Sequence, residues 1–118
     1  MKLQDVQNIL NATCITGPNG WETVEVKAAC GSDLMSDVLA FVKDQGMLLT
    51  GLVNPQVIRT AEMMDIKVIV FARGKAPGEE VIALAKELDM VILCTNKPLY
   101  VACGKLYANG LPGSREDD

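Results

Sequence analysis

The feature that most constrains the fold is an alternation of short apolar runs with amphipathic segments in the second half of the chain. Runs of buried-strand length stand at residues 47–50, 68–71 and 91–95. Each run precedes a segment with apolar residues at helical spacing, and these segments begin at Pro55, Glu79 and Leu99. Strand–helix units in series predict parallel strands joined by right-handed helical crossovers. The fold class is therefore predicted to be α/β.

The first half is expected to add a short amphipathic helix over residues 3–11, a strand running from 24 to 30, and a helix from Leu34 that ends at Gly46. A length of 118 residues fits one domain. The prediction is a single three-layer domain over residues 1–109, with a mainly parallel sheet flanked by helices. Residues 110–118 are polar and rich in helix breakers, so they are expected to form a mobile tail.

The most informative part of the composition is a histidine count of zero. It removes the commonest general base, the Ser-His and Cys-His nucleophile pairs, and most zinc sites. A net charge of −4 argues against a nucleic-acid binder, which would present a basic face to phosphates. The composition therefore favours a protein that is not an enzyme.

The chain contains four cysteines and no C-x-x-C spacing, at positions 14, 30, 94 and 103. Without such spacing and without histidines, neither a metal centre nor another cofactor is expected. Scattered cysteines in apolar segments usually behave as small hydrophobic residues in a reducing compartment. No stretch reaches the ~18 apolar residues that a membrane span requires, and the start does not look like a signal peptide. We therefore expect a cytoplasmic protein without membrane contact.

A ligand site is predicted at the carboxyl ends of the strands, where ligands settle in open parallel sheets. The loops there lead into helices, so free backbone N–H groups and two basic side chains are expected to face an anion. The candidate ligand-binding residues are Gly31, Ser32, Asp33, Thr50, Gly51, Arg73, Gly74, Lys75 and Thr95. The alternative is structural: the glycines permit tight turns, and Ser32 and Asn54 cap helices.

Two features leave room for an enzyme. Asp33 and Asp37 are spaced i, i+4, so both carboxylates fall near one helix face, although two carboxylates alone make a weak cation site. Cys30 precedes an expected helix N-terminus and is the one thiol whose pKa is expected to be lowered. Catalysis would have to run on these groups without histidine.

Two stretches make the chain resemble the DRTGG domain family over nearly all of residues 1–108. One is the segment at 30–39, which is similar to that family's S-D-L-L-S-D-V pattern. The other is a spaced pattern that runs from Thr50-Gly51 through residues 68–71, 74–77 and 79–81 to Cys94-Thr95. The resemblance implies a compact α/β domain similar to the N-terminal domain of HPr kinase/phosphorylase. It also implies a regulatory or dimer-forming role without catalysis.

The chain departs from the family's naming motif at two loops. Leu52-Val53 stand where the family often has Asp-Arg, and Ala72-Arg73-Gly74 stand where it has Thr-Gly-Gly. If the ligand site survives, Arg73 should point into the strand-end cleft near Thr50, Gly51 and Thr95. If the site is vestigial, which we favour, Arg73 should lie along the surface or pair with Glu79 or Glu80.

The function predicted from the sequence is a non-catalytic regulatory or protein-interaction module that forms a homodimer. Its further partner is expected to be another cytoplasmic protein, with a redox enzyme as one candidate. The alternative is a sensor domain that binds a nucleotide or another small anionic ligand at the strand ends.

Overall fold

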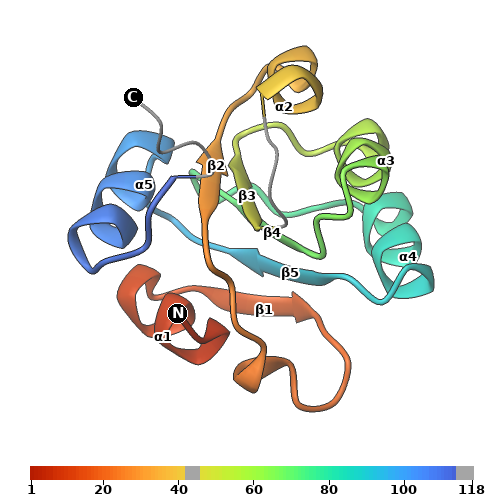
Figure 1. The fold of residues 1–118 in the computed structure, drawn as a ribbon. Helices are drawn as coiled ribbons and strands as arrows, with labels where there is room; N and C mark the ends of the chain where they lie inside the picture. The colour runs from red at the N-terminus through yellow and green to blue at the C-terminus, as the bar shows by residue number, and fades with distance from the viewer. Residues whose placement is uncertain (42–45, 114–118) are drawn as a thin grey trace.

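The computed structural model describes residues 1–41 and 46–113 of the chain. Its strands and helices follow one another along the chain as Figure 1 shows. The elements, in order, are α1 (Leu3–Leu10), β1 (Thr13–Thr16), the 3-10 turn η1 (Trp21–Thr23), β2 (Ala29–Gly31), α2 (Met35–Phe41), β3 (Met47–Thr50), α3 (Pro55–Met63), β4 (Val68–Phe71), α4 (Glu79–Glu87), β5 (Val91–Cys94) and α5 (Leu99–Ala108).

The five strands form one sheet in the order β1-β5-β4-β3-β2. Strands β2, β3, β4 and β5 run parallel, and β1 is added antiparallel to β5 at the far edge. The carboxyl ends of the four parallel strands therefore lie at one edge of the sheet. Thr13, at the start of β1, pairs with Cys94 at the end of β5, so β1 begins at that same edge.

Helices cover both faces of the sheet, with α1 and α5 on one side and α2, α3 and α4 on the other (Figure 1). Side chains alternate between these two cores along each central strand, as strand geometry requires. In β4, Val68 and Val70 pack with α1 and α5, while Ile69 and Phe71 pack with α2, α3 and α4. Because both faces are buried, β3 and β4 are apolar without interruption, apart from Thr50.

The α/β class and the mainly parallel three-layer arrangement are confirmed. The local signals explain why: Asn54 caps α3 by accepting a hydrogen bond from the Val57 N–H at 3.1 Å, and Pro55 occupies the first helical position. The sequence analysis missed β1. It also placed the second strand too early, because residues 24–26 make only an isolated bridge between Glu25 and Lys2.

Part of the segment predicted as a mobile tail packs against the domain. Leu111 is buried, and the Ala29 N–H donates to the Pro112 carbonyl at 2.9 Å along the outer edge of β2. Residues 114–118, the rest of that tail, lie outside the described residues. The same is true of residues 42–45, just before the predicted helix end at Gly46.

Within the described part of the chain, no helix is both long and apolar enough to cross a membrane.

Candidate functional site

Four of the predicted site residues come together where β3 ends. Asp33 Oδ1 accepts hydrogen bonds from the Gly51 N–H at 2.6 Å and from the Thr50 hydroxyl at 3.1 Å. Gly51 is also held through its carbonyl, which accepts a hydrogen bond from Lys75 Nζ at 3.1 Å. We call Asp33, Thr50, Gly51 and Lys75 the strand-end cluster. It ties the loops after β2, β3 and β4 to one another.

Three backbone N–H groups that follow β4 bond to carbonyls of the chain itself. The amide of Arg73 donates to the Lys97 carbonyl at 2.8 Å, and that of Gly74 donates to the Thr95 carbonyl at 2.8 Å. The Ala72 amide donates to the Thr50 carbonyl at 3.0 Å. The sequence analysis expected free amides at these loops, but at these positions internal partners hold them. An anion would have to displace one of those partners.

Besides Arg73 and Gly74, three more predicted residues do not join the cluster. Thr95 is buried, and its hydroxyl donates to the Leu10 carbonyl at 2.7 Å, which fastens the end of α1 to the end of β5. The Ser32 hydroxyl bonds to the N–H and the carbonyl of Leu34, which precedes α2, so it makes a local turn and not the predicted helix cap. Gly31 lies under α5, where an added Cβ would come within about 2.5 Å of the Cys103 sulfur.

A polar hollow of about 230 Å³ opens at the same edge, next to the start of β1. Gly74 and Lys75 line it, together with residues that the sequence analysis did not select: Asn11, Thr13, Ile15, Ala76, Cys94 and Asn96. Asn11 ends α1 in the left-handed conformation, with φ of 50°. An asparagine after an amphipathic segment is a sequence signal for a helix end, so the role of Asn11 as the end of α1 could have been predicted. Its place beside the hollow could not, because that depends on β1, which was not predicted.

The thiols are not activated. Burial is the largest cause that raises the pKa of Cys14, Cys30 and Cys103, and it raises the pKa of Cys94 to about 11. The neighbouring Asp37 carboxylate raises the pKa of Cys30 further. The expectation of a lowered pKa at Cys30 is therefore wrong, because the loss of hydration outweighs any effect of the following helix. Among the described residues, no group of three or more cysteine, aspartate or glutamate side chains is arranged to hold a metal ion.

A second, larger concavity lies outside the predicted site. It is an apolar groove of about 600 Å³ between α5, the β2 edge and the segment that follows α5. The sequence analysis selected only Gly31 among its lining residues. The groove also includes Leu49, Tyr100, Cys103, Leu106, Tyr107, Leu111 and Pro112.

The comparison that decides the family is the match of the DRTGG domain to residues 5–106. The chain belongs to the DRTGG domain family. No curated protein matches it.

A solved structure shares the fold. It is the crystal structure of the CBS and DRTGG domains of the regulatory region of Clostridium perfringens pyrophosphatase, complexed with the activator diadenosine tetraphosphate. The TM-score is 0.75 at 16% sequence identity, and the match covers 99% of this chain and 51% of that one. This chain therefore spans about half of the solved structure.

The loop that departs from the DRTGG motif keeps an unusual backbone. Arg73 and Gly74 are both left-handed, with φ of 64° and 70°. Two consecutive positive φ angles favour glycine, which adopts this region without steric penalty. Here an arginine holds the first position. Its side chain is exposed and makes no hydrogen bond or ion pair with any described residue, Glu79 and Glu80 included.

Proposed function

We propose that this DRTGG domain is a non-catalytic regulatory or protein-interaction module that acts as a homodimer. The observation that supports it best is that the loops at the carboxyl ends of the strands hydrogen-bond to one another. Asp33 and Lys75 both bond to Gly51, and the amides after β4 bond to carbonyls. Apart from the Arg73 side chain, these predicted ligand-binding groups are thus engaged in holding loops together.

The side-chain chemistry agrees with this proposal. The chain has no histidine, and burial raises the pKa of each of its four thiols. Thiols with a raised pKa are poor nucleophiles at neutral pH, because the thiolate is the reactive form. What remains is a small domain with a large apolar groove, which suits contact with another protein chain.

The test is the mass of the protein in solution at micromolar concentration. Light scattering should give twice the 12.7 kDa of one chain, with dissociation on dilution. A constant single-chain mass at all concentrations would remove the homodimer from the proposal. Purification from native cytoplasm under reducing, anaerobic conditions tests for the second cytoplasmic partner, including a redox enzyme. Recovery of the chain alone would count against such a partner.

A second candidate function is a sensor for a nucleotide or another small anion. Two observations favour it: the polar hollow lined by Lys75, and the diadenosine tetraphosphate bound by the regulatory region of the Clostridium perfringens pyrophosphatase. At 230 Å³ the hollow is smaller than the ~300 Å³ lower limit of typical small-molecule pockets, so it suits one phosphate-bearing end of a ligand.

Thermal-shift titration separates the two candidates. A sensor should be stabilised by diadenosine tetraphosphate, ATP or a sugar phosphate, because a ligand that binds only the folded state raises its apparent stability. Lys75→Met should abolish the shift. The matched control, Lys86→Met, removes an exposed lysine from α4 and should leave the shift intact. No shift at millimolar ligand would contradict the sensor function.

A further inference from the structure

The outer surface of α5 is apolar although it faces solvent. Tyr100 is 88% exposed, Tyr107 is 73% exposed and Val101 is 39% exposed. Gly104 and Ala108 are exposed beside them, and Lys105 is the only charged residue of the helix. We call Tyr100, Val101, Gly104, Tyr107 and Ala108 the tyrosine face. It carries both tyrosines of the chain.

The other α-helices present carboxylates, and α5 does not. Asp5 lies on α1, Asp37 on α2, Glu62 on α3, and three glutamates lie on α4. The chain as a whole has a net charge of −4. On α4 the three glutamates outnumber the single lysine, Lys86, so two copies that met through α4 would bring acidic groups together; on α3 the charge of Arg59 balances that of the one carboxylate. The tyrosine face is the helical surface where two copies of this acidic chain can approach without opposing carboxylates.

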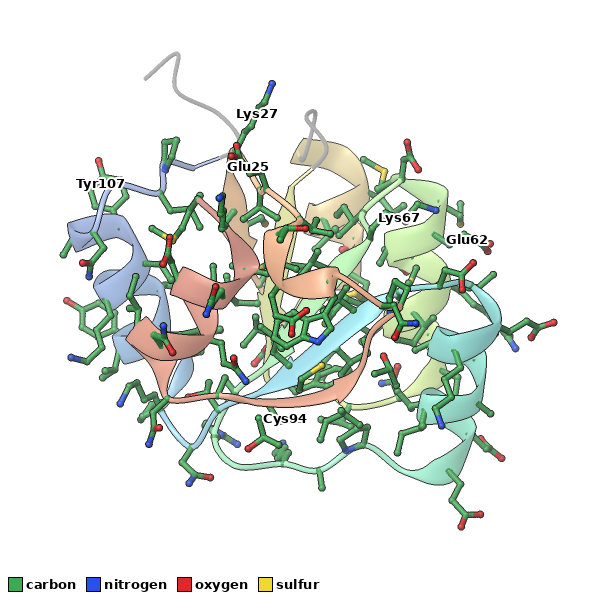
Figure 2. All side chains as sticks on the ribbon, turned by 90° about the horizontal axis from the view of Figure 1, so that it is seen from below. Glu25, Lys27, Glu62, Lys67, Cys94 and Tyr107 are labelled. Atoms are coloured by element: carbon green, nitrogen blue, oxygen red, sulfur yellow. The ribbon has the colours of Figure 1, made fainter. Side chains whose placement is uncertain are left out.

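The tyrosine face combines a protruding side chain, that of Tyr107, with an apolar groove. Figure 2 shows Tyr107 projecting away from the body of the domain. Tyr107 also forms part of the wall of the apolar groove of about 600 Å³ between α5 and the β2 edge. A two-fold contact requires one surface that is complementary to itself, so that a residue of each copy meets the groove of the other. A protruding aromatic side chain next to an apolar groove meets that requirement.

The two tyrosines supply part of the area that an interface needs. Each tyrosine side chain can bury about 150–250 Å². At 88% and 73% exposure, the two together offer roughly 300 Å². A standard interface buries ~800 Å² per partner. The rest has to come from neighbouring exposed residues such as Val101 and Lys105 and from the half-buried Pro112. Tyrosine is enriched among the residues that dominate binding energy at interfaces.

We propose that the tyrosine face and its groove are the surface on which a second copy of this chain docks, with Tyr100 and Tyr107 as anchors. This inference rests on the proposed homodimer and assigns its interface. The partner is the same surface of another copy, related by a two-fold axis.

The test compares dimer dissociation constants, measured by sedimentation or light scattering across a dilution series. Tyr100→Glu and Tyr107→Glu should each weaken the dimer by at least about 30-fold, the effect of losing a binding hot spot. The matched control is Met63→Glu. Met63 is 73% exposed, the same fraction as Tyr107, but it lies on α3, so its substitution should leave dissociation within about threefold.

The outcomes are distinct. A wild-type protein that stays a single chain at about 100 μM would overturn the homodimer and this interface together. A dimer that Tyr100→Glu and Tyr107→Glu weaken no more than Met63→Glu does would leave the homodimer standing and overturn this interface. A single chain that binds a different protein through the tyrosines would also overturn it. Tyr107→Ala is a milder variant, and urea unfolding measures whether it keeps the stability of the fold. A weaker dimer in a variant that is still folded then reflects the interface and not unfolding.

Discussion

The Oδ1 atom of Asp33 lies 2.6 Å from the backbone nitrogen of Gly51 and accepts its hydrogen bond. Asp33 stands in the loop before α2, while Gly51 follows β3. This contact therefore ties the loop between β2 and α2 to the end of β3, the strand that neighbours β2 in the sheet.

Replacing Asp33 with alanine should lower the free energy of unfolding by about 1–2 kcal/mol, since the amide of the buried Gly51 loses a charged acceptor. Asp33→Asn should lose less than half of that, because its amide oxygen still accepts from Gly51 and Thr50. Urea unfolding measures both. Asp37→Ala, which changes an exposed residue of α2, is the control and should alter the free energy of unfolding by no more than about 0.5 kcal/mol. Equal effects of the alanine substitutions at 33 and 37 would show that the contact adds nothing.

Gly31 should not tolerate a side chain. A Cβ there would lie about 2.5 Å from the Cys103 sulfur, closer than real Cβ contacts come. Gly31→Ala should therefore destabilise the fold by about 1–3 kcal/mol, the usual effect of overpacking.

Combining Gly31→Ala with Cys103→Ala should relieve the clash, because the sulfur that the new Cβ meets is removed. In a double-mutant cycle, the two changes together should be less destabilising than their sum. Gly104→Ala is the contrast, because no atom lies within 4 Å of the added methyl group and the position is helical. It should stabilise the fold by about 0.5–1 kcal/mol. Additive effects at 31 and 103 would rule out the contact as the cause.

Arg73→Gly should be more stable than Arg73→Ala. Both substitutions remove the same exposed cation, but only glycine relaxes at φ of 64°. A left-handed non-glycine residue is strained by about 1–2 kcal/mol, and the greater unfolded-state freedom of glycine offsets part of the gain. The expected difference is about 0.5–1 kcal/mol, readable as a shift of the urea midpoint at constant slope. If alanine proves equal or better, the loop does not hold this backbone in solution.

The stability of the fold should decrease in alkaline solution partly through Cys94. Its pKa in the folded state is raised to about 11 from its ordinary value of 9.0, with burial as the main cause and Cys14 second. The folded state thus holds the thiol proton more tightly than the unfolded state does. The stabilisation is complete below about pH 9 and is lost as the pH rises toward 11.

The comparison is between wild type and Cys94→Ala in urea unfolding from pH 7 to pH 10.5. The variant should lose less stability than wild type over the upper part of that range. In the folded wild type, alkylation of the thiols by iodoacetamide at pH 7 should be slow and should accelerate in urea. Parallel pH curves for the two proteins would contradict the raised pKa.

The sequence predicts the central part of this fold well, and the reason is local. Strands β3, β4 and β5 are short apolar runs, and Asn54 and Pro55 mark the start of α3. Strand β1 lacked such a signal. Its four residues, Thr13–Thr16, place two apolar residues between two threonines, which is neither a continuous apolar run nor an alternation. Their pairing with β5 joins segments about 80 residues apart.

The candidate site was predictable only in part. Parallel topology correctly brought Asp33, Thr50, Gly51 and Lys75 to one edge. Their hydrogen bonds to one another could not be foreseen, because they depend on side-chain geometry across three loops. Residues such as Asn11 and Thr13 entered the polar hollow through the unpredicted β1. The tyrosine face did have a signal, a helix without acidic residues, but which side of α5 stays exposed depends on packing.

The order of the strands has a consequence for biosynthesis. The N-terminal strands β1 and β2 lie at opposite edges, and the three strands between them follow later in the chain, over residues 47–94. As the chain leaves the ribosome, its first 31 residues therefore have no partner strand until β3 and β5 follow. The Pro112 carbonyl, which accepts from the Ala29 N–H, is synthesised after all five strands. Such non-local pairing slows folding, so this domain should complete its sheet only after synthesis has passed residue 94.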